Sequence, residues 1–296
     1  MRLFITGGTG FIGTGLCQRL LEDGHELTVL TRQPPRPAAS RVHYLAWSSP
    51  TWSTALAPCD AVINLAGESV ATRWTPSRKH AIRDSRLVTT RRLIESLTDI
   101  SPRPRVLVSA SAIGYYGPRG DEPLEESSLS GQGFLARTCQ EWESQAQQAE
   151  SLGVHVVRLR IGVVLGPDGG ALSKMLPMFR VGLGGPIGSG RQWMSWIHRD
   201  DIVGLIRWAL ARQQVSGAVN ATAPEPVTMR VFAQTLGRAV RRPAVLPAPA
   251  LMLRMLLGEM AEMLVTGQRV LPTVALAHGY SFQFPQLTQA LVACVS

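Results

Sequence analysis

A glycine-rich turn close to the N-terminus constrains the fold more than any other feature of the chain. Residues 4–13 read FITGGTGFIG, in which Gly7, Gly10 and Gly13 form a GxxGxxG pattern. A strand pattern, RLFIT at 2–6, precedes the turn, and a helical pattern, FIGTGLCQRLLEDG at 11–24, follows it. A glycine motif alone indicates only a tight turn, but this order of strand, turn and helix is typical of a dinucleotide-binding site.

Each glycine has a physical role in such a site. Gly7 permits the tight turn, Gly10 lets the backbone approach a pyrophosphate, and Gly13 lets the helix pack closely on the strand. The free N–H groups at the start of the helix then face the phosphates. From this turn we expect the following residues to bind the cofactor: Gly7, Thr9, Gly10, Phe11, Ile12 and Gly13.

The end of the second predicted strand indicates which dinucleotide is bound. A site specific for NAD carries an acidic residue about 20 positions after the glycines, where it binds the ribose hydroxyls. Here the strand ELTVLT at 26–31 is followed by Arg32, and no Asp or Glu occurs between positions 26 and 60. Arg36 and Arg41 lie downstream. Because an arginine fork suits a 2′-phosphate, we predict NADP(H) bound by Thr31 and Arg32; the alternative for Arg32 is a solvated loop residue.

Strand and helix patterns continue to alternate through the first half of the chain. They predict strands at 41–47, 61–67, 105–111 and 154–160, helices at about 76–98 and 134–152, and a proline-rich loop at 34–40. Strands rich in Val, Ile and Leu that alternate with helices favour a buried parallel sheet. The expected fold class is α/β, a Rossmann-type doubly wound parallel sheet with a smaller mixed C-terminal lobe. We place the NADP-binding domain at 1–166 and the substrate lobe at 167–296, with later segments returning to the first domain.

Composition limits the partners and the compartment. The formal charge of +9 comes from scattered arginines without a dense basic run, so nucleic acid is not expected as a partner. Four distant cysteines form no CxxC pair, which favours reduced thiols in the cytoplasm and no metal site. The apolar stretch at 251–265, LMLRMLLGEMAEMLV, is interrupted by charges and therefore predicts an amphipathic helix, not a membrane span.

Several segments together resemble the extended short-chain dehydrogenase/reductases. They are GGTGFIG at 7–13, DAVINLAGE at 60–68, SASAIGYYG at 109–117 and WIHRDDIV at 196–203. Two further segments, RIGVVLGPDGG at 160–170 and FRVGLGGPIGSGRQWMSWIHRDD at 179–201, resemble an atypical branch called NAD(P)-dependent epimerase/dehydratase or epimerase-family proteins. The resemblance spans nearly the whole chain, including a short C-terminal domain.

The resemblance implies further cofactor contacts. The NLAG segment places Leu65, Ala66 and Gly67 over the adenosine and pyrophosphate. Arg86, on a helix that faces the cofactor in relatives, could reach a phosphate or could form a salt bridge on the helix surface. Val163 matches the stretch that passes near the nicotinamide. A homodimer through paired long helices would also suit the superfamily.

The usual catalytic pair of the superfamily is missing from this chain. Relatives combine a Ser with a YxxxK pair, in which the Lys lowers the pKa of the Tyr and the Tyr transfers a proton as hydride moves. Ser111 matches the serine, with Ser109 as its neighbour, but Phe134 and Thr138 occupy the positions of the Tyr and the Lys. Neither of the two lysines in the chain has a tyrosine four residues before it.

Three interpretations of this departure stay open. In the first, another group transfers the proton, and Ser111 with Tyr116 is the catalytic candidate, ahead of Tyr115 and the more distant His198 and Asp200. In the second, the protein binds NADP(H) and uses its redox state as a signal. In the third, the site binds only. The tyrosines have the alternative of packing beneath their loop, and His198 and Asp200 that of capping the helix that follows them.

A glycine-dense loop at 182–192, GLGGPIGSGRQ, is the candidate substrate segment. Its glycines permit close approach to a ligand or a flexible lid. Arg191 could bind an anionic group, with Trp193 and Trp196 as apolar walls; the alternative is a structural loop whose tryptophans fill the seam between the lobes. The sequence predicts an NADP(H)-dependent oxidoreductase or epimerase-like enzyme for an unidentified small molecule, a nucleotide-linked sugar being one candidate. A catalytically silent NADP(H) sensor is the alternative.

Overall fold

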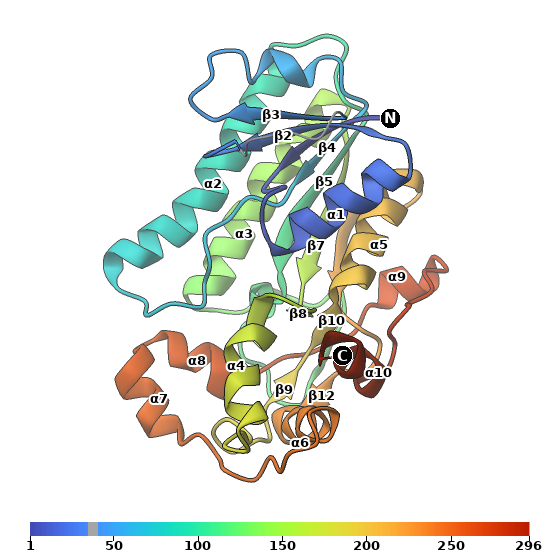
Figure 1. Ribbon diagram of the computed structural model, residues 1–296. Helices are drawn as coiled ribbons and strands as arrows, with labels where there is room; N and C mark the ends of the chain where they lie inside the picture. The colour runs from blue at the N-terminus through green and yellow to red at the C-terminus, as the bar shows by residue number, and fades with distance from the viewer. Residues whose placement is uncertain (35–40, 296) are drawn as a thin grey trace.

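A seven-stranded parallel sheet forms the centre of the structure, a computed structural model that describes residues 1–34 and 41–295 (Figure 1). The strand order is β3-β2-β1-β4-β5-β7-β11, and every neighbouring pair is parallel. The strands are Arg2–Thr6 (β1), Glu26–Thr31 (β2), Val42–Ala46 (β3), Ala61–Asn64 (β4), Val106–Ala112 (β5), His155–Ile161 (β7) and Gly217–Ala221 (β11). The predicted Rossmann-type sheet is confirmed.

Helices cover both faces of this sheet. On one face α1 (Phe11–Glu22) packs against α5 (Arg199–Ala211), and on the other α2 (Pro76–Thr98) packs against α3 (Phe134–Gln147) (Figure 1). Alternation along β1 explains the two layers, because Leu3 and Ile5 join the core beneath α1 and α5, whereas Phe4 joins the core beneath α2. Both faces of the sheet are therefore buried, as parallel sheets require.

Local signals in the sequence set several helix ends. The Thr75 side chain accepts a hydrogen bond from the Arg78 N–H at 3.2 Å, and Pro76 occupies the first position of α2. After α1, Gly24 has a φ of +84°, which ends the helix where the sequence predicts. The predicted helix at 134–152 divides into α3 and a short 3₁₀ helix, Gln148–Leu152; two others are Thr54–Leu56 and Ile113–Tyr116.

A smaller mixed lobe lies at the carboxyl ends of the strands (Figure 1). Its core surrounds Trp196, Phe232 and Leu291. Apart from α5, the helices after residue 166 are α4 (Gly170–Arg180), α6 (Met229–Ala239), α7 (Ala250–Leu257), α8 (Met260–Val265), α9 (Thr273–Ala277) and α10 (Leu287–Val295). The short strands of the lobe are β6 (Pro123–Leu124), β8 (Val163–Leu165), β9 (Trp193–Met194), β10 (Trp196–His198), β12 (Val227–Thr228) and β13 (Arg269–Val270).

Three segments after residue 166 return to the sheet domain: β11 pairs with β7, α5 packs on α1, and α9 packs on β11. The amphipathic stretch at 251–265 is two helices, α7 and α8, because Gly258 between them has a φ of +60°. Within the described residues, no helix is both long and apolar enough to cross a bilayer. Residues 35–40 of the predicted proline-rich loop, Arg36 among them, lie outside the described residues.

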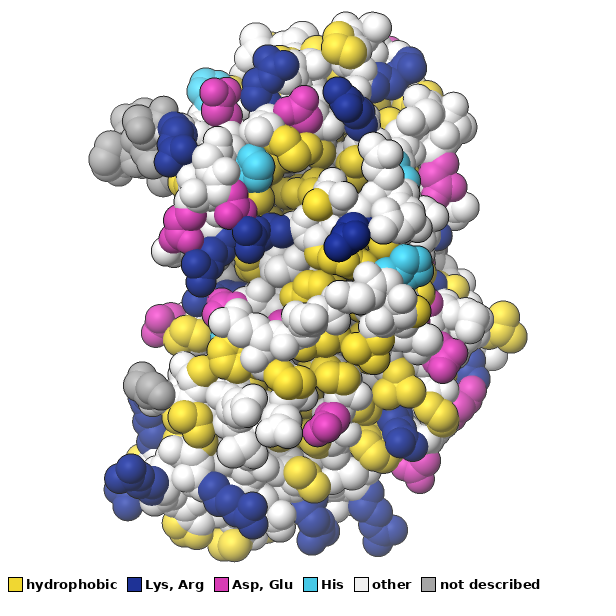
Figure 2. Space-filling model, turned by 90° about the vertical axis from the view of Figure 1, so that its right-hand side faces the viewer, with side chains coloured by type: hydrophobic (Ala, Val, Ile, Leu, Met, Phe, Trp, Pro, Cys, Tyr) yellow, Lys and Arg dark blue, Asp and Glu magenta, His cyan; other side chains and the backbone are white. Residues whose placement is uncertain are grey.

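Basic side chains do not form one continuous patch on the face that Figure 2 shows. Lys and Arg side chains are separated there by apolar and uncharged groups, with several of them at the lower end of the C-terminal lobe. The positive charge of the chain is therefore dispersed over this face, as the scattered arginines of the sequence lead one to expect.

Candidate functional site

The glycine turn joins β1 to α1 at the carboxyl edge of the sheet. Gly7 has a φ of +72°, and a Cβ at this position would lie 2.7 Å from the Leu65 carbonyl group. A Cβ on Gly13 would lie 2.2 Å from the Gly7 oxygen, so both positions need glycine for backbone packing. Gly10, the N-cap of α1, is less confined, since its Cβ would approach only the Gly7 oxygen at 3.3 Å. The missing side chain of Gly10 thus leaves room for a ligand beside the N-terminus of α1.

A cavity of about 450 Å³ opens beside this turn. Eight of the predicted cofactor residues line it: Gly7, Thr9, Gly10, Thr31, Arg32, Leu65, Ala66 and Gly67. Sequence reasoning missed seven others that share the lining, namely Leu30, Trp47, Glu68, Ser85, Val88, Thr89 and Arg92. We call this space the turn cavity. Its position at a helix N-terminus, with glycines on one side and apolar side chains such as Trp47 and Val88 on the other, fits the adenosine and pyrophosphate parts of a dinucleotide.

Two arginines give the turn cavity its charge. The Arg32 side chain is 81% exposed at the end of β2 and forms an ion pair with Glu68. The Arg92 guanidinium, from α2, lies 5.3 Å from the ring centroid of Trp47. Two arginines against one glutamate leave the lining positive, which favours an anionic group at this end of the cavity.

Arg86 lies behind the loop that covers the turn cavity. It donates hydrogen bonds to the carbonyl oxygens of Glu68 at 3.0 Å and Ile82 at 2.8 Å, and its guanidinium lies 5.3 Å from the Trp142 ring centroid. A Cβ on Gly67 would come within 3.1 Å of that guanidinium. Burial lowers the pKa of Arg86. Through these contacts Arg86 positions the loop at residues 65–68.

Other predicted cofactor residues have structural neighbours that the sequence did not reveal. The Phe11 ring packs under Gly169 and Gly170, where a Cβ would lie 2.4 Å and 2.7 Å from ring carbons. The GPDGG segment at 166–170 therefore needs its glycines to cover the first turn of α1. Ile12 packs against the core of the sheet, and Val163 begins β8 directly after β7.

The two predicted catalytic residues lie in a buried polar cluster. Ser111, 2% exposed, donates a hydrogen bond to Glu143 Oε1 at 2.7 Å. Glu143 forms a buried, bidentate ion pair with Arg160, with distances of 2.9 Å and 3.0 Å. Arg160 also donates to the hydroxyl of Tyr116 at 2.9 Å, and that hydroxyl donates to Asn220 Oδ1 at 2.6 Å. The cluster ties β5, β7, β11 and α3 together.

This environment favours a structural role for Tyr116 over the predicted proton transfer. Burial raises the pKa of Tyr116 to about 12, whereas a catalytic tyrosine works near neutral pH with a lowered pKa. Neither Ser111 nor Tyr116 lines the turn cavity or the second cavity described below. Ser109 is also bonded inside the protein, since it accepts a hydrogen bond from Asn64 Nδ2 at 3.3 Å.

His198 caps a helix. Its Nδ1 accepts a hydrogen bond from the Asp200 N–H at 3.2 Å, and His198 is the N-cap residue of α5. Burial lowers the pKa of His198, which keeps the ring neutral and Nδ1 available as an acceptor. The capping alternative for His198 is therefore confirmed.

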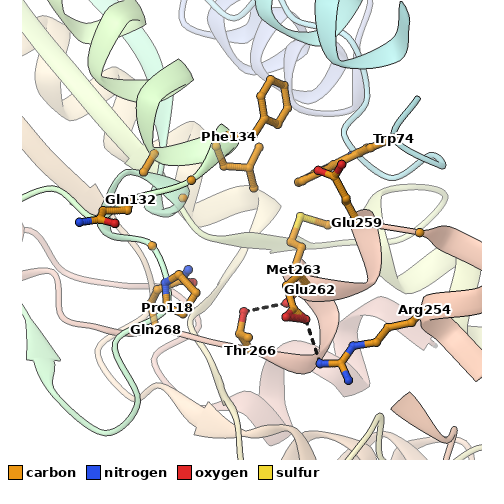
Figure 3. Close-up of a pocket in the computed structure, with 16 residues that line it drawn as sticks. Trp74, Pro118, Gln132, Phe134, Arg254, Glu259, Glu262, Met263, Thr266 and Gln268 are labelled. Carbon is orange, nitrogen blue, oxygen red and sulfur yellow. Dashed lines mark hydrogen bonds and ion pairs between the residues drawn. The ribbon is translucent and has the colours of Figure 1, made fainter. Parts of the chain in front are cut away.

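A second cavity, of about 530 Å³, lies between α3 and the C-terminal lobe (Figure 3). Its walls come from Trp74, the loop at 114–118, the first turn of α3 at 133–136 and the segment 254–268. Phe134, at the position of the family's tyrosine, belongs to this wall, and its ring meets the Trp74 ring edge to face at 5.2 Å. We call this space the lobe cavity. The position that carries the tyrosine in relatives therefore lies in the wall of the lobe cavity.

The glycine-dense loop does not bring its predicted substrate residues into either cavity. Arg191 is exposed, and Trp193 Nε1 donates a hydrogen bond to Asp121 Oδ1 at 2.6 Å. Gly185 packs backbone against backbone, because a Cβ there would lie 2.1 Å from the Leu246 oxygen. At Gly185 the loop is structural, and Trp196 is fully buried in the core of the lobe.

Known proteins match both parts of the chain. A family model described as NAD dependent epimerase/dehydratase family matches residues 3–221, and one described as a domain of unknown function, DUF1731, matches 248–294. The chain is 43% identical over 301 residues to the Arabidopsis thaliana protein called Epimerase family protein SDR39U1 homolog, chloroplastic, covering 99% of this chain and 86% of that one. It is 38% identical over 294 residues to Epimerase family protein YfhF of Bacillus subtilis, covering 98% and 97%.

One solved structure is similar over almost its full length. The human epimerase family protein SDR39U1 (isoform 2), solved with NADPH, superposes with a TM-score of 0.91 at 38% sequence identity. The match covers 99% of this chain and 98% of the human chain. The likeness therefore spans both the sheet domain and the C-terminal lobe.

Proposed function

The chain belongs to the NAD-dependent epimerase/dehydratase family, and from this membership we propose that it is an NADP(H)-dependent oxidoreductase or epimerase-like enzyme for a small molecule. The observation that carries the proposal is the positive turn cavity, with Arg32 and Arg92 beside the N-terminus of α1. The NADPH in the structure of the human relative supports the choice of cofactor.

The chain's own residues would hold NADP(H) along the carboxyl edge of the sheet. The N–H groups at the start of α1, next to Gly10, would receive the pyrophosphate. Thr31, Arg32 and Arg92 would hold the 2′-phosphate, with Arg32 exchanging the Glu68 carboxylate for the phosphate. When bound, the nicotinamide would supply or accept the hydride of the reaction.

The proton of the reaction comes from solvent in this proposal. Phe134 has no proton to give, and Thr138 donates its hydroxyl to the Phe134 oxygen at 2.8 Å. Glu259 and Glu262, which line the lobe cavity, are 65% and 56% exposed, so water reaches its wall. A water molecule can therefore stand where relatives place the tyrosine hydroxyl.

One observation favours a second candidate, a catalytically silent NADP(H) sensor. Ser111 and Tyr116, the hydroxyl groups expected near the reacting atoms, are buried in the Glu143–Arg160 cluster and line neither cavity. A protein with this arrangement could bind the cofactor tightly and perform no chemistry on it.

Deuterium transfer distinguishes the two candidates. NADPH that carries deuterium at the transferable position is incubated with the protein and pools of small carbonyl compounds, and products are examined by mass spectrometry. We expect deuterium to appear in the products of one class of carbonyl compound. With the Arg32→Asp variant and a limiting concentration of NADPH, we expect those products to carry no deuterium. Tight NADPH binding without label transfer across a broad panel would support the sensor, and absence of NADPH binding would contradict both candidates.

A further inference from the structure

Apolar side chains form the upper wall of the lobe cavity. Trp74 and Phe134 meet there edge to face, and Figure 3 shows Met263 below both rings, pointing into the same space. The thioether of methionine and the faces of aromatic rings make favourable contacts with other planar rings. This part of the cavity therefore suits a flat, apolar group.

The charged groups of the lobe cavity are acidic or already paired. Among the lining residues, all within the described part of the chain, Arg254 is the single cation, and it pairs with Glu262 at 3.3 Å. Glu259 pairs with Lys79, which lies outside this lining. A nucleoside diphosphate needs cations to balance its phosphates. Here it would meet two carboxylates and one cation, whereas the lining of the turn cavity has two cations and one carboxylate.

The start of α3 offers hydrogen bonds to a neutral ligand. Gly133, the N-cap of α3, has no side chain to cap the helix, and the first turn contains no acidic residue. The first N–H groups of a helix have no acceptor within it, and residues 133–136 belong to the cavity wall. A carbonyl oxygen can accept these hydrogen bonds without bringing the negative charge that the glutamates would repel.

From these contacts we infer that the lobe cavity binds a neutral, planar aromatic carbonyl compound and not a nucleotide-linked sugar. The ring lies against Trp74, Phe134 and Met263, and the carbonyl oxygen faces the start of α3. The inference rests on the proposed function, because it names the substrate class of that enzyme. Binding of the ligand nevertheless needs no hydride transfer, so it can be measured separately.

Prodan, a neutral aromatic ketone whose emission shifts to the blue in apolar surroundings, is the first ligand to test. It is titrated into the full chain saturated with NADP⁺, with UDP-glucose as competitor. We expect saturable binding that UDP-glucose does not reverse, and a roughly tenfold loss of affinity in Met263→Ala and in Trp74→Ala. Met255→Ala is the matched control, because Met255 is exposed on α7 and does not line the cavity, and it should bind prodan like the wild type.

Charge provides an independent readout. Naphthoate, an anion of similar shape, should bind roughly tenfold more weakly than prodan, and Glu262→Gln should narrow that difference by weakening the repulsion. Displacement of prodan by UDP-glucose would overturn the inference, as would equal effects of Met255→Ala and Met263→Ala.

Calorimetry with NADP⁺ on the same samples separates this inference from the proposed function. If the protein binds NADP⁺ but not prodan, the proposed function stands and the inference about the ligand of the lobe cavity is wrong. If the protein binds prodan in the lobe cavity but does not bind NADP⁺, the proposed cofactor is wrong and the inferred ligand class stands.

Discussion

At the level of single residues, the ion pair between Glu143 and Arg160 is the most strongly buried charge pair near the carboxyl edge of the sheet. Both side chains are almost fully buried, and Arg160 is also bonded to the Tyr116 hydroxyl and to the Glu126 carbonyl oxygen. An intact buried pair adds little net stability, but removal of one partner leaves an uncompensated charge. The cluster is therefore sensitive to single substitutions.

Glu143→Gln should lower the free energy of unfolding by about 3 kcal/mol, because Arg160 would stay buried without its anion. Glu141→Gln is the matched control on the same helix, since Glu141 pairs with Arg83 at the surface, and it should cost less than about 1 kcal/mol. Urea denaturation of the two variants tests the difference. Equal losses of unfolding free energy in the two variants would show that the buried ion pair matters no more to stability than the surface pair.

The four cysteines should be unreactive in the folded protein. All are buried, and burial raises the pKa of Cys17, Cys59 and Cys294 to about 11 and that of Cys139 to about 12. Near pH 8 the thiols are then protonated and covered, so Ellman's reagent should label them only after unfolding in urea. Because the folded pKa values exceed the usual 9.0, the free energy of unfolding should fall as pH rises from 9 toward 11. Rapid labelling of a native thiol would contradict this.

At the level of elements, α1 contains two glycines with opposite requirements. A Cβ on Gly13 would meet the Gly7 oxygen at 2.2 Å, whereas a Cβ on Gly15 would meet only the flexible end of Arg199 at 3.4 Å. Gly13→Ala should destabilise the protein by about 2 kcal/mol and abolish NADPH binding. Gly15→Ala should stabilise it by about 0.5 kcal/mol through helix propensity and leave binding intact. Thermal unfolding and calorimetry test both, and a harmless Gly13→Ala would disprove the packing of the turn.

Six of the seven sheet strands were predictable because they are short runs rich in Val, Ile and Leu that alternate with helical patterns. The seventh, β11, was not predicted, because its sequence GAVNA is short and contains no such run. The short strands of the C-terminal lobe were not predicted either, because pairs of two residues such as β9 and β12 are set by tertiary contacts. In the turn cavity, too, some residues were predictable and others were not. Thr31 and Arg32 could be assigned from their spacing after the glycines, whereas Arg92 belongs to α2 and reaches the cavity only through folding.

The buried cluster had a signal in the sequence that was missed. Arg160 stands within VHVVRLR, an apolar strand pattern, and a charge inside a central strand must find a partner. Glu143, on the predicted helix just before that strand, is that partner. Ser111 was assigned by resemblance and Tyr116 by its position just after Ser111, and neither argument shows that the cluster binds both hydroxyl groups.

At the level of the whole molecule, the C-terminal segment is anchored to the sheet domain by one carboxylate. Asp201, in α5, accepts hydrogen bonds from the N–H groups of Gln283 at 2.6 Å and Phe284 at 2.9 Å. The Tyr280 hydroxyl donates to the Asp201 carbonyl oxygen at 3.0 Å. Burial raises the pKa of Asp201, and the two N–H hydrogen bonds to its carboxylate partly offset that rise.

Asp201→Asn should release this anchor, because the amide keeps only one acceptor oxygen for two N–H groups. Hydrogen exchange of residues 280–295 should become faster, and the free energy of unfolding should fall by about 2 kcal/mol. Asp200→Asn, at the neighbouring and more exposed position, is the control and should leave exchange in this segment unchanged. Identical exchange in the Asp201→Asn variant would show that the segment is held elsewhere.

The central claim is that the arginine at the end of β2 selects NADP(H), and a titration of wild type and Arg32→Asp with NADPH and NADH tests it most directly. Nicotinamide fluorescence reports binding of both. We predict that wild type binds NADPH roughly 30-fold more tightly than NADH, as expected for charge-assisted hydrogen bonds to a 2′-phosphate, and that Arg32→Asp reverses the preference. Comparable affinities of wild type for the two cofactors, or an unchanged preference in the variant, would contradict the account.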